Sequence, residues 1–210
     1  MKNNSIINKL EKNLLSEPSD EIVSFRHWHD FQDRIRHFEK DLPKLRSASV
    51  LIPIVEDNNE YFVLLTERAR HMKTHPGQIS FPGGGQEGFE TVLQTALREA
   101  EEEIGLPVNQ VRPLGYLDQY PTISGYRVSP VVGLVVGDFT PRLQTEEVVS
   151  LIRVPLDYLL DPANHQFAAI EFDNEKAQVA EINYGSHRIW GATAGMILSL
   201  FERLNPLASF

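Results

Sequence analysis

Hydrophobic positions follow two different periods in the central part of the chain. Residues 49–55 (SVLIPIV) and 61–67 (YFVLLTE) are short apolar runs rich in β-branched residues, with the polar stretch EDNNE between them. This pattern predicts two strands joined as a hairpin. From residue 90 to 104 the apolar positions instead recur three or four residues apart, which predicts an amphipathic helix. We expect Gly105 and Pro107 to end that helix.

The rest of the chain predicts more strands than helices. Strands are expected at 78–81, 112–120, 126–136 and 148–154, with weaker ones around 167–172 and 179–184. A short helical turn is expected at 155–160 and a closing helix at 190–204. Many strands with only two strong helices favour an α+β fold, an α/β/α sandwich with a mixed central sheet, over a doubly wound parallel sheet.

The first forty-five residues differ in texture from the remainder of the chain. Residues 6–15 (IINKLEKNLL) are spaced like an amphipathic helix, and SEPSDE breaks it. We find no internal repeat or long linker. The sequence therefore predicts an N-terminal helical appendage over 1–45 and one main domain over 46–210.

Composition excludes several classes of protein. Of the 210 residues, 41% are apolar and 23% charged, which is ordinary for a soluble globular protein. No apolar run approaches the roughly 20 residues that span a bilayer, and the first residues lack a signal peptide's apolar block, so we expect a cytoplasmic protein. Cysteine is absent, which excludes disulfides and thiolate chemistry. A net charge of −9 argues against a broad nucleic-acid surface.

One stretch of the predicted helix, REAEEEIGL, concentrates negative charge. Glu99, Glu102 and Glu103 are spaced i, i+3 and i+4 and therefore share one stripe, while Glu101 points away. Like charges at this spacing cost a helix roughly 0.2–0.5 kcal/mol per pair, so the arrangement does not serve helix stability. Carboxylates on a rigid scaffold suit hard divalent cations such as Mg²⁺ or Mn²⁺. The alternative is a solvated acidic face, which is the commoner meaning of EAEEE alone.

The residues around this stripe form a longer pattern. Glycines at 83–85 precede the helix, and Glu90 lies near its start. The spacing G-x5-E-x7-R-E-U-x-E-E-x-G-U, with U a bulky aliphatic residue, resembles that of the Nudix hydrolases, although Ala100 is small for the first U. The matching positions are Gly84, Glu90, Arg98, Glu99, Glu102, Glu103 and Gly105. The resemblance implies Glu99, Glu102 and Glu103 as metal ligands, Arg98 as the group that orients them, and Glu90 as a structural or outer ligand.

A basic loop lies just upstream of the glycines. The segment LLTERARHMKTHPGQISFPGG resembles the motif LLTxR[SA]x3Rx3GxVxFPGG of the coenzyme A pyrophosphatase branch, with Lys73 and Ile79 as departures. The loop also concentrates positive charge in an acidic protein, which suits a substrate with several phosphates. A surface loop kept soluble by charge is the alternative. The substrate-binding residues that we predict are Arg68, Lys73, His75, Gly83 and Gly84.

Four further residues are weaker candidates. Glu146 and Glu147 lie in a loop, where the resemblance allows an acid to serve as an extra metal ligand or as the base; we include Glu147 among the catalytic candidates, and Glu99 is the other candidate base. Tyr126 and Trp190 could stack on an adenine, although core positions suit both.

The resemblance implies a metal-dependent hydrolase for the pyrophosphate bond of coenzyme A or its thioesters. The products would be adenosine 3′,5′-bisphosphate and 4′-phosphopantetheine or its acylated form. Two alternatives stay open: a Nudix hydrolase for another nucleoside diphosphate such as ADP-ribose or NADH, and a non-catalytic Nudix ligand-binding domain. The expected partner is the small-molecule substrate, coenzyme A or acyl-coenzyme A, with no nucleic acid or membrane, and a homodimer is left open.

Overall fold

The computed structural model describes residues 3–26, 28, 42–72, 75–172 and 175–206. In this part of the chain, no helix has both the length and the apolar character that a membrane crossing needs. The helices are α1 (Asn3–Asn13), α3 (Val92–Ile104), α4 (Leu156–Leu159) and α5 (Ala192–Leu204), with 3-10 turns η1 (Leu42–Lys44), η2 (Val108–Gln110) and η3 (Pro162–Asn164).

A mixed sheet forms the centre of the molecule. Its strands are β1 (Arg46–Asp57), β2 (Glu60–Arg68), β3 (Ile79–Ser80), β4 (Gly83–Gly85), β5 (Val111–Tyr116), β6 (Tyr120–Pro121), β7 (Tyr126–Val135) and β8 (Val148–Pro155). The main order is β3-β2-β1-β7-β5; β4 pairs with β1, β6 with β7 and β8 with β2. Because β1 runs parallel to β7 and antiparallel to β2, the sheet is mixed, as predicted.

The predicted hairpin is confirmed as β1 and β2. Asn58 and Asn59 connect the strands with φ values of 51° and 63°. Positive φ at both positions is what a two-residue hairpin turn requires, and Asn tolerates it better than most residues.

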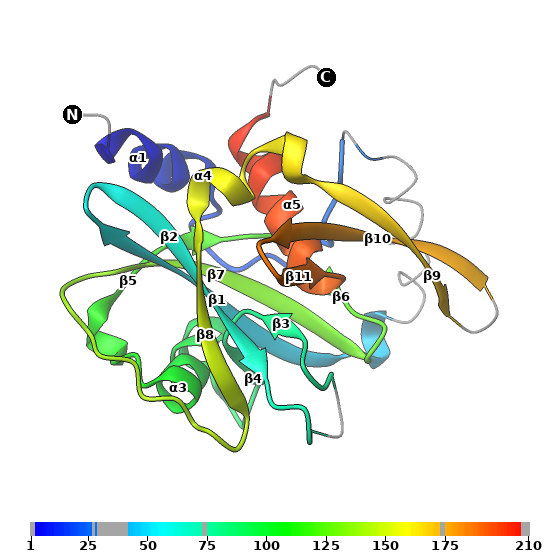
Figure 1. Ribbon diagram of the computed structural model, residues 1–210, viewed down its shortest axis with the longest axis horizontal. Helices are drawn as coiled ribbons and strands as arrows, with labels where there is room; N and C mark the ends of the chain where they lie inside the picture. Colours follow the sequence, from blue (N-terminus) through cyan, green and yellow to red (C-terminus); the bar gives the residue numbers. More distant parts are fainter. Residues whose placement is uncertain (1–2, 27, 29–41, 73–74, 173–174, 207–210) are drawn as a thin grey trace.

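Alternate residues of the sheet face different helices. On β1, Leu51 packs with the buried face of α3, whereas Ile52 packs in the larger core with residues of α1 and α5. The same alternation separates Leu64 from Leu65 on β2. Figure 1 shows α3 on one side of the sheet and α1 and α5 on the other. The α/β/α arrangement is thus confirmed.

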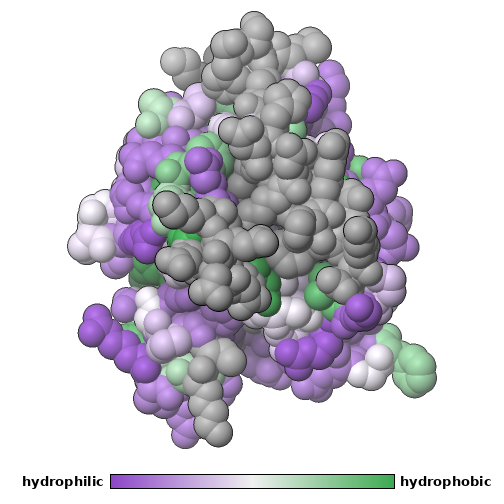
Figure 2. Space-filling model, turned by 90° about the vertical axis from the view of Figure 1, so that its right-hand side faces the viewer, coloured by the Kyte–Doolittle hydropathy of each residue, from purple (hydrophilic) through white to green (hydrophobic). Residues whose placement is uncertain are grey.

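A second, three-stranded sheet of β9 (Gln166–Phe172), β10 (Glu175–Tyr184) and β11 (His187–Trp190) projects from the body, in the order β11-β10-β9 (Figure 1). Strand β11 was not predicted, and Trp190, which was expected to begin the closing helix, is its last residue. In the structure Ile189 is buried and Arg188 exposed, the alternation of a strand, and Gly191 with φ 63° separates it from α5. Figure 2 looks onto the end from which β9 and β10 project: the described residues there are mostly hydrophilic, with a few hydrophobic ones between them.

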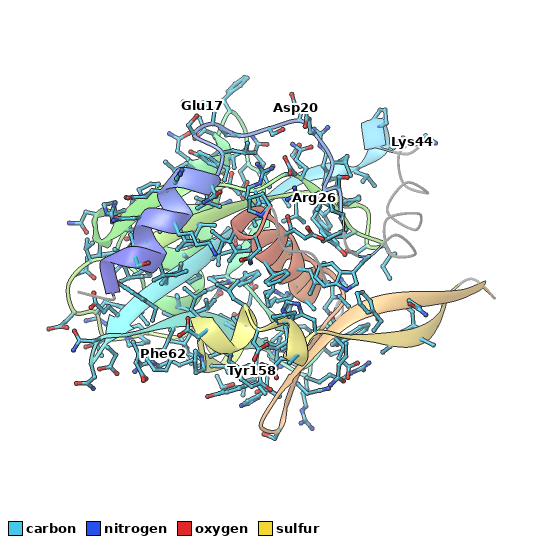
Figure 3. All side chains as sticks on the ribbon, turned by 90° about the horizontal axis from the view of Figure 1, so that it is seen from above. Glu17, Asp20, Arg26, Lys44, Phe62 and Tyr158 are labelled. Atoms are coloured by element: carbon cyan, nitrogen blue, oxygen red, sulfur yellow. The ribbon has the colours of Figure 1, made fainter. Side chains whose placement is uncertain are left out.

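The described part of the N-terminal segment packs into the larger core. Ile7, Leu10 and Leu14 of this segment are buried there. Leu15 and Tyr116 exchange two backbone hydrogen bonds, which ties the segment to β5. Further along, the backbone N–H of Arg26 donates to the buried carboxylate of Glu202 at 3.1 Å, and Figure 3 shows Arg26 beside α5. The division into an appendage and a main domain stays a prediction.

We expect Leu10→Ala to lower the free energy of unfolding by about 2–5 kcal/mol, because it removes a fully buried side chain from the larger core. Lys12→Ala, on the exposed face of the same helix, should change it by less than about 0.5 kcal/mol. Urea denaturation of both variants checks this, and equal small losses would show that α1 contributes nothing to the core.

Candidate active site

Helix α3 carries most of the site, and its ends are well defined. Thr91 caps its N-terminus: the side chain accepts from the Gln94 N–H, and the Gln94 side chain accepts in return from the Thr91 N–H, a capping box. The helix therefore starts at Val92, two residues later than predicted, and Glu90 lies just outside it. At the other end Gly105 is left-handed (φ 70°) and donates to carbonyls of the last turn, as predicted.

The carboxylates of the predicted stripe differ in how deeply they are buried. Ala96, Ala100 and Ile104 are fully buried, which presses one side of α3 onto the sheet. Glu103 borders this face and is buried, whereas Glu102 is exposed to solvent. Within the described residues, no three acidic or histidine side chains already lie close enough together to make a complete cation site.

Arg98 connects most of these carboxylates. Its Nε and Nη2 donate to the two oxygens of Glu90, at 2.7 and 3.2 Å. Its Nη1 donates to Glu99 at 2.9 Å and to Glu102 at 3.1 Å, and Nη2 also donates to the Gly85 carbonyl at 3.1 Å. The orienting role that the resemblance implies for Arg98 is consistent with this geometry and stays a prediction.

Glu90 is the strongest partner of Arg98. The hydrogen bonds from Arg98, and secondarily the N–H of Glu87, lower the pKa of Glu90 to about 2. Glu90 in turn raises the pKa of Arg98. Glu90 also accepts from the hydroxyl of Thr95 at 2.9 Å. It is therefore a permanently charged anchor between the loop and the helix.

The glycine strand β4 leaves room for the carboxylates. A Cβ on Gly83 would lie 2.5 Å from the Ser49 carbonyl oxygen, so only glycine fits against β1 there. A Cβ on Gly84 would lie 2.5 Å from Oε1 of Glu99, so the absent side chain is the space that this carboxylate occupies. At Gly85 a Cβ would meet nothing within 4 Å.

Glu103 is the most strongly perturbed acid of the site. Burial is the main reason why the pKa of Glu103 is raised from 4.5 to about 8; nearby Arg68 lowers it, while Glu99 and Glu147 raise it further. The Gly83 N–H is a backbone donor to this carboxylate, yet Oε2 has no hydrogen-bond partner among the described residues. A buried carboxylate oxygen without a partner is costly unless a cation or proton compensates it.

The pKa of Glu99 is also raised. Burial raises the pKa of Glu99, and the charges of Glu102 and Glu147 add to this, while Arg98 opposes it. Two carboxylates with raised pKa values on one helix suit a divalent cation. Such a cation would supply positive charge to both and would give Oε2 of Glu103 a partner. Glu99, Glu102 and Glu103 thus have the chemistry that the ligand prediction needs.

Arg68 links Glu103 to a second loop. It ends β2 next to a bulge, and its guanidinium nitrogens lie 4.0 Å from Glu103 Oε1 and 4.0 Å from Glu147 Oε2. The Ala69 N–H donates to the Glu147 carbonyl at 2.7 Å, which fixes the loop against β2. Glu147 therefore lies beside the acidic cluster, whereas Glu146 is exposed. The sequence alone could not separate these two neighbours.

The basic loop is only partly described. Lys73 lies outside the described residues. His75 has a φ of 55°, is exposed, and its Nδ1 lies 2.8 Å from Oε1 of Gln78. Arg70 and His71 are exposed. Of the predicted phosphate-binding cations that the structure describes, Arg68 is thus the one that reaches the carboxylates.

A cavity of about 360 Å³ adjoins this cluster on the other side of β4. Arg68, His75 and the glycines 83–85 line one part of it. The rest of the lining includes polar residues and apolar or aromatic side chains from β7, β9, β10, β11 and α5: Tyr126, Ile170, Val179, Trp190 and Met196. The cavity lies between the central sheet and the small sheet, where β11 lies beside β3 (Figure 1). Tyr126 and Trp190 are half-buried wall residues, and the sequence contained no signal for Ile170, Val179 or Met196.

Comparison with known proteins identifies relatives of most of this chain. The sequence model of the family described as NUDIX domain matches residues 44–173. A Yersinia enterocolitica protein named uncharacterized Nudix hydrolase NudL is 39% identical over 159 residues, 75% of this chain and 81% of its own. A protein of the same name from Enterobacter sp. is 35% identical over 162 residues, 77% of this chain and 84% of its own.

Solved structures give more distant matches. The crystal structure of a Nudix hydrolase from M. smegmatis, RenU, is 24% identical, covers 53% of this chain and 71% of that one, and has a TM-score of 0.46. A binary complex of a C. elegans Ap4A hydrolase is 17% identical, covers 52% of this chain and 80% of that one, and has a TM-score of 0.47.

We expect Gly84→Ala to weaken Mn²⁺ binding by about tenfold or more while leaving the fold intact. The new methyl group would displace the flexible end of Glu99, and losing the support of a ligand typically costs this much in affinity. Gly85→Ala is the matched control, because its methyl group meets nothing. Titration of free Mn²⁺ by electron paramagnetic resonance measures both, and equal affinities would refute the role given to Gly84.

The raised pKa of Glu103 predicts a pH dependence of metal-free stability. Between its ordinary value of 4.5 and about 8, the native state holds a proton that the unfolded state has released, so stability falls as pH rises. The slope should be about 1.4 kcal/mol per pH unit, and Glu103→Gln should remove it. Urea denaturation in EDTA at several pH values tests this, with exposed Glu101→Gln as the control.

Proposed function

Because the chain belongs to the Nudix domain family and is a Nudix hydrolase, we propose that it hydrolyses the diphosphate bond of coenzyme A or its thioesters. The products are adenosine 3′,5′-bisphosphate and 4′-phosphopantetheine, or the acylated form of the latter. The motif LLTERARHMKTHPGQISFPGG suggests this substrate class, and the site around it supplies the chemistry.

One observation carries the proposal: the acidic cluster and an apolar cavity share a wall of cationic and glycine residues. Arg68 and Gly83–Gly85 line the cavity, while Arg68 lies 4.0 Å from Glu103 and Gly84 makes room for Glu99. A substrate that joins a diphosphate to an organic group can therefore place its diphosphate beside the carboxylates and its organic group in the cavity. Coenzyme A and its thioesters have this construction.

Nudix hydrolases generally use divalent metal ions, and we propose Mg²⁺ or Mn²⁺ held by Glu99, Glu102 and Glu103. Such a cation would lower the pKa of a bound water molecule and would neutralise charge on the phosphoryl oxygens of the substrate. Arg98 keeps Glu99 and Glu102 oriented and limits their mutual repulsion. Arg68 and His75 line the cavity together with Gly83 and Gly84 and are proposed to bind the diphosphate there, with Lys73 of the same loop as a further cation.

Two residues can accept the proton of the attacking water. Glu99 is half-buried and has a raised pKa, which brings it closer to the pH at which a base works best. Glu147 stands beside Arg68 and close enough to Glu103 to raise its pKa. Exposed Glu146 lacks these contacts, so we propose Glu99 and Glu147 as the alternatives.

The second candidate function is hydrolysis of another nucleoside diphosphate such as ADP-ribose or NADH. The aromatic wall of Tyr126 and Trp190 favours a planar base without distinguishing these substrates. A non-catalytic ligand-binding domain is the remaining alternative. The retention of Glu99, Glu102 and Glu103 together with their Arg98 support argues against it.

Product analysis tests the proposal. Purified protein with Mg²⁺ or Mn²⁺ should release adenosine 3′,5′-bisphosphate from coenzyme A, and mass spectrometry in ¹⁸O-labelled water should locate the label on one phosphorus. Glu102→Gln should lower this turnover by orders of magnitude, because an amide is a poor ligand for a hard cation. Glu101→Gln, on the same helix but outside the stripe, should retain it. A clear preference for ADP-ribose would move the proposal to the second candidate, and no product from any of these substrates would favour a non-catalytic domain.

A further inference from the structure

We propose that Arg46 binds the ribose 3′-phosphate of the substrate and that the enzyme thereby selects 3′-phosphorylated nucleotides. This inference rests on the proposed function, since it places the adenosine end of coenzyme A in the cavity beside the carboxylates. It assigns Arg46 as a specificity-determining residue of the site.

Arg46 adjoins a wall of the cavity, beyond the part of β1 that pairs with the glycine strand. It is the first residue of β1 and pairs in register with Tyr126, the wall residue of β7. Ala48 and Val50, which follow at alternate positions of β1, line the same cavity. Arg46 therefore lies on the same face of β1 as these two lining residues, and its guanidinium carbon lies 4.2 Å from the centre of the Tyr126 ring.

The spacing along β1 suits two phosphates on one nucleoside. Ala48 pairs with Gly85, which is next to Gly84, the nearer of the two glycines at which the diphosphate is proposed to bind. A strand rises about 3.3 Å per residue, so Arg46 begins roughly 7 Å further along β1 than Ala48. A ribose phosphorylated at its 5′ and 3′ positions spans a gap of this order, and the flexible Arg side chain covers the difference.

Arg46 differs from Arg68 and Arg188, two other arginines at or beside the cavity wall, in having no carboxylate close to its guanidinium among the described residues. Arg68 faces the carboxylates of Glu103 and Glu147. Arg188 stacks over Trp190 at 5.0 Å, but it is paired with Glu181 at 2.6 Å. Arg46 is exposed, and within the described ranges its guanidinium has no carboxylate partner. Its contact with the Tyr126 ring holds it in place without neutralising it.

Several polar groups of the cavity wall are occupied within the protein. Thr193 donates to the Ile79 carbonyl at 3.1 Å, and the Ser80 and Thr66 hydroxyls lie 3.3 Å apart. Thr122 is engaged with the backbone of Tyr126. The wall therefore offers a base more surface for stacking than groups for hydrogen bonding. We infer that the enzyme distinguishes nucleotides by the charge of their phosphates, which Arg46 recognises.

The test compares coenzyme A with 3′-dephospho-coenzyme A, which has the same diphosphate. In the wild type, kcat/KM should be higher for coenzyme A, and Arg46→Ala should lower the ratio of the two kcat/KM values by about tenfold or more, mainly through KM. Arg188→Ala removes a matched arginine from the neighbouring ring but one whose charge is already paired, so it should keep the wild-type ratio.

A binding experiment separates this inference from the proposed function. Calorimetry should show that adenosine 3′,5′-bisphosphate binds more tightly than adenosine 5′-monophosphate, and that Arg46→Ala removes the difference while Arg46→Lys retains part of it. If coenzyme A is not cleaved but this difference depends on Arg46, the proposed function fails and the phosphate site stands. If coenzyme A is cleaved and neither the ratio nor the difference changes in Arg46→Ala, the inference is wrong and the proposed function stands.

Discussion

The site depends on one cation that holds several anions in place. The guanidinium of Arg98 donates to Glu90, Glu99, Glu102 and the Gly85 carbonyl, and so joins the approach to α3, the helix and the glycine strand. Carboxylates three and four residues apart repel one another on a helix, and a planar donor group between them offsets that repulsion. The hydrogen bonds from Arg98 lower the pKa of Glu90 to about 2, so Glu90 stays ionised and is the main partner of the Arg98 charge. Glu99 and Glu102 can then lie close together without destabilising their own helix.

Different degrees of burial give the glutamates of α3 different pKa values. Glu102 remains in contact with water, whereas Glu103 is pressed between α3 and the sheet, where burial raises its pKa. Arg68 stands between Glu103 and Glu147, 4.0 Å from each. At that distance it reduces the repulsion without forming a close ion pair with either carboxylate. A cluster with this deficit of positive charge favours both a divalent cation and an anionic substrate that arrives with one.

The cavity adds a different kind of selectivity. Its walls come from the central sheet, the small sheet and α5, and several of its polar groups are satisfied internally. A protein with a net charge of −9 repels anions at a distance, so local cations without a carboxylate partner are the places where binding of a phosphate is expected. Arg68, which lines the cavity, is close to two carboxylates, whereas Arg46, which stacks on the wall residue Tyr126, has no carboxylate partner among the described residues.

Local features could be inferred from the order of residues alone. Helical periodicity put Glu99, Glu102 and Glu103 on one stripe, turn residues located the β1–β2 hairpin, and the motif spacing indicated the family, because each depends on neighbours within a few residues. Packing in three dimensions was needed to establish that Glu103 is buried, that Glu147 rather than Glu146 meets Arg68, and that β11 brings Trp190 to the cavity. Those outcomes arise from strand pairing and contacts between segments far apart in the chain, and such contacts leave no periodic signal in the sequence.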